Sequence, residues 1–496
     1  MEPMDWLGRE LKEEEAKLLT RRQLFGKTGY GIGVLALAQM LGTSAMASSG
    51  SAGSNPQAQN PLAPRPPHFT PKAKRVIFLF MAGAPSQLDL FDPKPVLSKN
   101  HMQPVPKEYL GDDKFPFMQG VPNLLGSPYK FAQHGQSGAW ISELLPHTAS
   151  IADDIAIVKS MHTEQLNHAP AQIFMNTGFQ LPGRPSMGSW LSYGLGSEAE
   201  SLPGFVVLLS GQNNPDGGKC MWSSGFLPSI YQGVEFRNSG DPVMYVSNPE
   251  GIPDAMRRRA LDTLKELNQQ NYEMVGDPEI ATRINSFELA YRMQSSIPEL
   301  VDLKKESQET LDLYGAKVGE PSFATNCILA RRMLERGSRF IQLYHRGWDS
   351  HGTGTGDDLM HALPARCKEV DQASAALIKD LKQRGMLEDT LVVWGGEFGR
   401  TPMNEARHGS NFLGRDHHGK AFSIWMAGGG IKPGITVGAT DDLGYHVVED
   451  KISVHDFHAT LLHLMGLDHT KLTYRSQGRD YRLTDVFGEV QEKLLK

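Results

Sequence analysis

Acidic and histidine residues gather in three short segments of the sequence. Asp349 and His351 stand two residues apart in a glycine-rich stretch, Glu397 follows two glycines, and His417 and His418 come directly after an aspartate. A carboxylate oxygen and an imidazole nitrogen at such spacing can reach one cation without a regular element. Taken alone, the first pair is also typical of a turn-capping aspartate beside a solvated histidine. Together, the three segments predict a site for a divalent metal ion.

Three further residues could act on a substrate. Arg400 carries a guanidinium that can bind two oxygens of a phosphate or sulfate group, with a structural salt bridge to Glu397 as the alternative. Thr163 could supply a nucleophile or bind an anion, or its hydroxyl could cap a turn or a helix. His168 could orient such a hydroxyl, bind the metal or contact the core. We take Arg400, Thr163 and His168 as candidate catalytic residues.

Apolar runs of strand length predict the elements that position these residues. The runs are residues 76–81, 155–158, 205–209, 340–344, 391–394 and 422–426. Because helical patterns separate several of them, they indicate an α/β fold with a mostly parallel central sheet and helices on both faces. Loops at the carboxyl ends of parallel strands converge at one edge. We therefore expect the candidate residues to meet there, with Asp89, after the first run, as a possible further metal ligand.

Residues 253–337 read as a helical insertion in this sheet domain. Within it, Met256, Ala260, Leu264 and Leu267 recur at helical spacing. Such a stripe is far more often core than a contact to a cofactor. We therefore expect this stripe to be buried.

The N-terminus carries the pattern of a twin-arginine export signal. Arg21 and Arg22 precede an apolar run at residues 29–41, and an Ala-x-Ala cleavage site follows. This run is shorter than the roughly 20 apolar residues of a membrane span, so we expect no stable transmembrane anchor. Residues 1–47 are thus predicted to be a signal peptide for the twin-arginine export machinery. The mature protein would then reach the periplasm or the extracellular space.

Composition limits what the remaining chain can be. Residues 48–71 are rich in Ser, Ala, Gln and Pro and predict a flexible linker, and residues 72–490 predict the α/β domain. The 496-residue chain has a formal net charge of −6, which provides no global basic field for nucleic acid. Its three cysteines exclude a fold built on disulfides.

Several motifs together resemble one bacterial family. They are residues 78–95, Trp348-Asp349-Ser350-His351, Gly395-Gly396-Glu397-Phe398-Gly399-Arg400, Asp416-His417-His418-Gly419, and the segment from His455 to Asp485. In these motifs the chain resembles the bacterial domain of unknown function 1501 family, which is similar in fold to the alkaline phosphatase and sulfatase superfamily. The resemblance implies an alkaline-phosphatase-like central sheet and metal-assisted cleavage of phosphate or sulfate esters.

The same resemblance implies roles for individual residues. The later Asp/His metal pair of the superfamily looks like Asp349 and His351. Its strand-end carboxylate looks like Glu397, and its late metal histidine looks like His417 or His418.

The chain departs from the superfamily at two positions and in its cysteines. Phe398 stands where many of these phosphatases have a histidine, and Gly83 stands where an early metal aspartate is usual, with Asp89 further on. None of the three cysteines begins the Cys-x-Pro-x-Arg motif that sulfatases convert to formylglycine. A formylglycine nucleophile is therefore not expected.

The residues and the resemblance together predict an exported, metal-dependent hydrolase of phosphate or sulfate esters. Its substrate would be a phosphorylated or sulfated small molecule or polysaccharide. Zinc suits a histidine-rich ligand set, whereas calcium, magnesium or manganese suits a carboxylate-rich one. The alternative is a non-catalytic protein of the same fold that binds an envelope component or a polysaccharide.

Overall fold

The computed structural model of the chain describes most of the predicted domain. The described residues are 60–110, 121–210, 214–237, 242–243, 247–248, 251–405 and 407–496. The predicted signal peptide and residues 48–59 of the predicted linker lie outside this part of the chain. Residues 60–71 contact the domain, since the backbone N–H of Arg65 donates to the Leu195 carbonyl at 2.9 Å. No helix in the described ranges is both long and apolar enough to cross a membrane.

Strand β1, Arg75–Ala82, lies inside a large sheet and is buried on both faces. Ile77 and Leu79 belong to one hydrophobic core, whereas Phe78 and Phe80 belong to a second core on the opposite face. Alternate side chains of a strand point to opposite faces. The continuous apolar run therefore indicates a strand that is covered on each side.

Nine strands form the central sheet within the described residues, in the order β14-β5-β13-β9-β1-β8-β6-β7, with β17 beside β5. Besides β1, they are β5 Ile155–His162, β6 Phe205–Ser210, β7 Val234–Phe236, β8 Phe340–Arg346, β9 Thr390–Gly395, β13 Phe422–Ala427, β14 Ile435–Val437 and β17 Ile452–Ser453. Neighbouring strands are parallel except where β13 pairs with β5 and with β9. The predicted mostly parallel sheet is confirmed, and each predicted apolar run lies in one of its strands.

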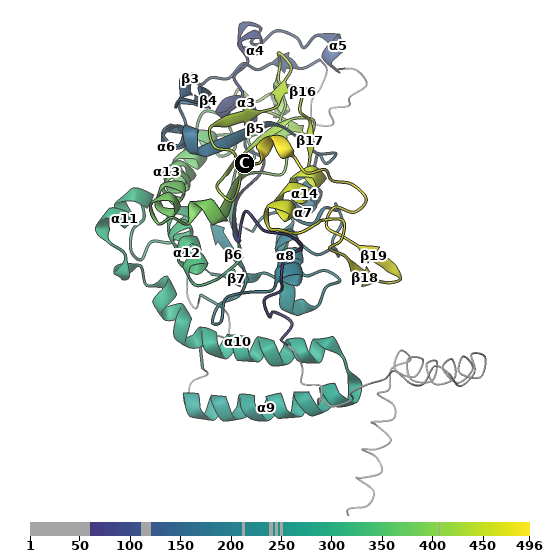
Figure 1. Ribbon diagram of the computed structural model, residues 1–496. Helices are drawn as coiled ribbons and strands as arrows, with labels where there is room; N and C mark the ends of the chain where they lie inside the picture. Colours follow the sequence, from purple (N-terminus) through teal and green to yellow (C-terminus); the bar gives the residue numbers. More distant parts are fainter. Residues whose placement is uncertain are drawn as a thin grey trace, which may run out of the picture. The chain divides into compact units, whose positions relative to one another are not determined.

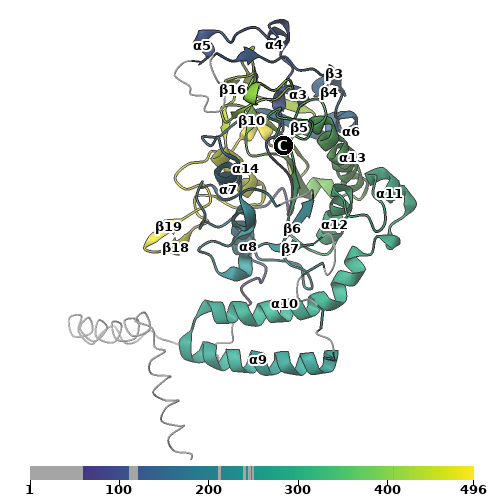
Figure 2. The same cartoon turned by 180° about the vertical axis from the view of Figure 1, so that it is seen from behind.

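Helices cover both faces of the sheet (Figure 1 and, from behind, Figure 2). Helices α12, Phe323–Glu335, and α13, Ala362–Gln383, share the core that contains Ile77. Helices α8, Met187–Leu195, and α14, Val454–Leu464, share the core on the other face. This arrangement confirms the predicted architecture of a sheet between two helical layers.

The remaining elements connect or flank these layers. The helices are α3 Gln87–Leu90, α4 Pro95–Lys99, α5 Lys107–Leu110, α6 Pro146–Ala149, α7 His168–Thr177 and α11 Gln308–Tyr314. The short antiparallel pairs are β2 Asn123–Leu124 with β11 Met403–Asn404, β3 Phe131–His134 with β4 Ala139–Ser142, β10 Gly399–Arg400 with β12 His417–His418, β15 Ala439–Thr440 with β16 Val447–Glu449, and β18 Tyr474–Ser476 with β19 Arg479–Tyr481.

Two long helices occupy part of the predicted helical insertion. Helix α10, Pro278–Val301, packs Ile297 and Leu300 into the core of the domain. Helix α9, Asp254–Val275, lies on the outer side of α10 (Figure 1) and has no buried side chain. The prediction that its apolar stripe is core is therefore wrong. Helical periodicity shows which side chains share a face, but it does not show what covers that face.

Candidate metal centre

The loop after β8 carries Asp349 and His351 and is held by tight packing. Trp348 is buried and its ring contacts the ring of Trp394, with 5.9 Å between the centroids. On the facing loop, Gly83 follows β1 with φ of +110°. A Cβ at this position would lie 2.7 Å from the backbone nitrogen of Asp349. Glycine therefore allows the two loops to approach this closely.

Three histidines from different parts of the chain converge on one oxygen of Asp349. The Nε2 atoms of His351, His168 and His417 lie 2.8, 3.2 and 3.5 Å from Asp349 Oδ1. The donor atoms of the four residues all lie within 4.8 Å of one another. The structure thus brings together three of the predicted metal residues with His168, which sequence reasoning placed among the catalytic candidates. We call these four residues the His₃Asp cluster.

The other ring nitrogen of each histidine is occupied by an anchoring group. Nδ1 of His168 bonds to Glu397 Oε1 at 2.7 Å, and Nδ1 of His417 bonds to the Leu166 carbonyl at 2.8 Å. Nδ1 of His351 bonds to the carboxylate of Glu405. A carbonyl or carboxylate oxygen only accepts, so the Nδ1 atoms of His168 and His417 donate to these anchors. A cation bound in the cluster would take the lone pair of each Nε2 in place of a proton. This arrangement is typical of metal-binding histidines.

The cluster fits a divalent cation in its chemistry and its dimensions. Nε2 of His168 is buried and has no hydrogen-bond partner among the described residues, although Asp349 Oδ1 is near. A buried polar atom without a partner costs free energy. Zinc–nitrogen bonds of about 2.0–2.1 Å place tetrahedral ligand atoms about 3.3 Å apart, close to the separations measured from Asp349. Three imidazoles and a carboxylate suit zinc better than a hard cation.

The pKa values set the protonation of the cluster. Burial lowers the pKa of His417 to about 4, and its hydrogen bond to Asp349 only partly offsets this effect. Burial also opposes the charge on His168, but the neighbouring carboxylates of Asp349 and Glu397 raise its pKa to about 9. Burial would raise the pKa of Asp349, yet the adjacent Arg400 holds it well below its usual range. At neutral pH and without a cation, the cluster therefore contains an ionised Asp349, a protonated His168 and a neutral His417.

Glu397 lies behind His168 and orients it. Its Oε1 accepts from the backbone N–H of Gly83 at 3.0 Å and from Gln172 Nε2 at 2.9 Å, in addition to the bond from His168. The side chain is fully buried. Glu397 is outside the His₃Asp cluster, so its predicted role as a direct ligand stays a prediction.

Arg400 is fully buried and binds protein groups. Its Nη2 lies 2.5 Å from Asp349 Oδ1. The salt bridge of Arg400 is thus formed with Asp349, whereas the sequence suggested one with Glu397. Its guanidinium also donates to the carbonyl oxygens of Gly83, Ala84 and Arg415. Arg400 thereby ties the two loops to the carboxylate of the cluster. Its binding of a substrate anion stays a prediction.

Besides Glu397 and Arg400, three further predicted site residues lie outside the cluster. Asp89 forms a fully buried ion pair with Arg415, at 2.8 Å. Nε2 of His418 bonds to the Tyr445 carbonyl at 2.6 Å. The backbone N–H of Thr163 donates to the Gly419 carbonyl. Of the two adjacent histidines, the structure places His417 in the cluster.

Sequence reasoning missed the groups that anchor the histidines. Glu405 and Gln172 belong to no motif. A backbone carbonyl such as that of Leu166 is present in every residue, so the sequence cannot single it out. Glu405 also forms a second buried group with His351 and Asp416, whose donor atoms lie within 4.8 Å of one another. The sequence offered one clue to this second group, namely Asp416, which directly precedes His417 and His418.

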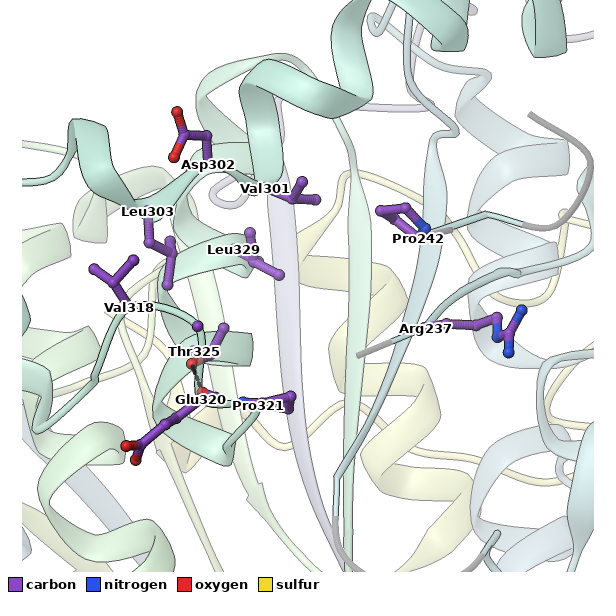
Figure 3. Close-up of a pocket in the computed structure, with 11 residues that line it drawn as sticks. Arg237, Pro242, Val301, Asp302, Leu303, Val318, Glu320, Pro321, Thr325 and Leu329 are labelled. Carbon is purple, nitrogen blue, oxygen red and sulfur yellow. Dashed lines mark hydrogen bonds between the residues drawn. The ribbon is translucent and has the colours of Figure 1, made fainter. Parts of the chain in front are cut away.

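Among the cavities that lie apart from the cluster, two have a lining that bears on the predicted residues or on α10. One, of about 300 Å³, is lined by Thr163, Phe174, Phe179 and His455 among others, and Phe174 belongs to α7. The other, of about 340 Å³, lies at the end of α10, where Val301, Leu303 and Leu329 contribute apolar surface (Figure 3). Thr163 thus faces a cavity next to α7. We call it the Thr163 cavity.

The family model described as Protein of unknown function (DUF1501) matches residues 73–495. The chain therefore belongs to this family, as its motifs predicted. No curated protein matches the sequence.

Three solved structures are similar to this chain at low sequence identity. The phosphonate monoester hydrolase SpPMH from Silicibacter pomeroyi is 11% identical, with 79% of this chain and 73% of that chain covered and a TM-score of 0.33. A protein in the alkaline phosphatase superfamily from Vibrio parahaemolyticus is 14% identical, with 85% and 73% covered and a TM-score of 0.31. The alkaline phosphatase from the Antarctic bacterium TAB5 is 10% identical, with 80% and 98% covered and a TM-score of 0.31. The chemistry of this chain must accordingly be argued from its own residues.

Proposed function

We propose that the protein is an exported, metal-dependent hydrolase of phosphate or sulfate esters. His168, Asp349, His351 and His417 would hold the cation, with zinc the best fit to this ligand set. The observation that carries the proposal is the convergence of three Nε2 atoms on Asp349 Oδ1 while each Nδ1 is anchored. When bound, the cation would polarise the ester oxygen and lower the pKa of water.

The chain's own residues would position the substrate and balance its charge. The side chain of Asp349 is 40% exposed, so an ester can reach the cluster from solvent. Arg400, fixed beside Asp349, adds positive charge next to the anionic group. Because Thr163 faces another cavity, we propose that water attacks the phosphorus or sulfur atom. The water loses a proton as it forms the new bond, the ester bond to the leaving oxygen breaks, and that oxygen takes up the proton released by the water.

The proposal is tested by metal content and by turnover together. Zinc bound to the purified mature protein is measured by elemental analysis, and phosphate and sulfate monoesters and diesters are assayed as substrates. We expect Asp349→Ala and His417→Ala to lose both bound metal and turnover, because each removes a ligand. Glu397→Ala should lose turnover through His168.

The matched control is His446→Ala, which removes an exposed histidine outside the cluster. It should keep both metal and activity. Full activity in Asp349→Ala and His417→Ala would end the assignment.

One observation favours the second candidate, a non-catalytic binding protein. The guanidinium of Arg400 is engaged by Asp349 and by three backbone carbonyls, which limits its availability to a transition state. Binding of a sulfated polysaccharide by the metal-loaded protein, with no turnover of any ester tested, would select this candidate.

Export is the remaining part of the proposal. Its support is the Arg21 and Arg22 pair before an apolar run. Replacing both arginines with lysine should leave the precursor in the cytoplasm, as measured by cell fractionation. Normal export of that variant would exclude the twin-arginine route.

A further inference from the structure

Helix α9 presents an apolar stripe that nothing in the described residues covers. Its 22 residues span about 33 Å at 1.5 Å per residue. Met256, Leu264, Leu267 and Val275 are 54%, 41%, 57% and 42% exposed. Contiguous exposed apolar side chains on one face are typical of an interaction surface.

The stripe does not face the neighbouring helix α10. Arg258 makes that contact, with a 2.7 Å ion pair to Glu288 and its guanidinium 4.8 Å from the ring centre of Tyr291. At about 100° per residue, Met256, Leu264 and Leu267 lie on a different flank from Arg258. The stripe is therefore open to a second helix while α9 stays packed on α10.

The spacing of the stripe reads the same in both directions. Five apolar residues, Met256, Ala260, Leu264, Leu267 and Val275, share this face with the polar Asn271, and the six positions are separated by 4, 4, 3, 4 and 4 residues. In an antiparallel pair of such helices, Leu264 faces Leu267 of the other copy, and Met256 faces Val275. A twofold interface requires a surface that is complementary to itself in this way.

We propose that α9 pairs antiparallel with α9 of a second copy of this chain, about a twofold axis between Leu264 and Leu267. Two such helices would pack their stripes along their full length. Contact through one helix of this length is small for a protein interface. We therefore expect a concentration-dependent dimer with a micromolar dissociation constant.

The charge of α9 argues against a lipid surface as the occupant. The helix carries four basic and four acidic side chains, namely Arg257, Arg258, Arg259, Lys265, Asp254, Asp262, Glu266 and Glu273. Helices that lie on anionic membranes are rich in Lys and Arg on their polar face. A helix without net charge lacks that attraction.

Sedimentation velocity of the full chain across low to high micromolar concentrations tests the pairing. Leu264→Lys with Leu267→Lys should raise the dissociation constant at least about tenfold, because the charges would meet at the axis. The matched control replaces Leu181 and Val486, which are exposed elsewhere, with lysine. It should leave dimerisation unchanged. A monomer at all concentrations, or a dimer insensitive to the α9 variant, would overturn the proposal.

Single cysteines distinguish the antiparallel pairing from a parallel one. Met256 and Val275 of one chain lie about 28 Å apart along the helix. A Met256→Cys protein mixed with a Val275→Cys protein should therefore form a disulfide-linked dimer, whereas neither variant alone should do so beyond the native protein. Cross-linking of Met256→Cys with itself would overturn the antiparallel arrangement. Cosedimentation of a monomeric protein with phosphatidylglycerol vesicles, lost in the α9 lysine variant, would instead assign the stripe to a membrane.

Discussion

Glu397 shows how a residue outside the cluster can control it. The carboxylate fixes the ring of His168 through Nδ1, so its replacement should weaken the site without removing a ligand. We expect Glu397→Gln to lower zinc affinity about 10–100-fold, the usual effect of losing such a partner. The measurement is competition for zinc with a chelator of known affinity.

Glu449→Gln provides the control for this variant because Glu449 is exposed and belongs to no site. Unchanged zinc affinity in Glu397→Gln, with affinity lost in Asp349→Ala, would show that His168 needs no anchor.

His458 predicts how the fold responds to acid. It is completely buried on α14, and burial lowers its pKa to about 3, although its bond to the Met175 carbonyl opposes this effect. Below about pH 6.5 the unfolded chain binds a proton at this residue while the folded chain does not. Stability is therefore lost as pH falls from 6.5 towards 3, by up to about 1.4 kcal/mol per pH unit for one proton.

His458→Gln should reduce this loss by about 2 kcal/mol between pH 7 and pH 5. Urea unfolding at the two pH values measures the difference. An equal loss in the variant and the native protein would contradict the assignment.

Residues of the site could be predicted from the sequence only where other polar residues stand close to them in the chain. Asp349, His351 and His417 stand in short polar motifs, and the structure brings them together. Asp89 has the same chemistry but pairs with Arg415, which lies 326 residues away. Nothing in the local sequence shows such a pairing, because it depends on how the chain folds.

Gly83 links two strand-end loops at the scale of elements. A side chain there would meet the backbone of Trp348 and Asp349 at 2.9 and 2.7 Å, and φ of +110° disfavours any other residue. Gly83→Ala should therefore displace the loop after β8 and reduce zinc affinity and turnover at least about tenfold, since small misplacements of reacting groups are costly.

The change is measured by zinc competition and by assays of Gly83→Ala beside Gly354→Ala. Gly354 lies in the same loop region with open space around it. Equal affinities in both variants would show that the close approach is not needed.

The strands of the central sheet were predicted well, because a short continuous apolar run fits a strand that is buried on both faces. Each of the six apolar runs forms a strand, because a continuous apolar run of this length needs cover on two sides. Helix α9 shows the limit of this reasoning. Its stripe is as regular as a buried one, and regularity does not identify the surface that it contacts.

At the scale of the whole molecule, the cluster joins segments that are far apart in sequence. His168 begins α7, Asp349 and His351 follow β8, and His417 lies in β12. A cation bound there should stabilise the folded state by about 2.7 kcal/mol at a hundredfold excess over its dissociation constant.

Thermal unfolding with zinc and with a chelator measures this stabilisation. We expect the chelator to lower Tm in the native protein and to have no effect on Asp349→Ala. A Tm that does not depend on chelator in the native protein would contradict a structural contribution of the cation.

Helix α7 connects the His₃Asp cluster with the Thr163 cavity. Its first residue, His168, stands in the cluster, and Phe174, six residues later, lines the Thr163 cavity. Six residues of helix rise about 9 Å. The helix fixes the distance between the cluster and that cavity. A substrate with its anionic end at the cluster and its organic end in the cavity would therefore be selected by its length more than by its polarity.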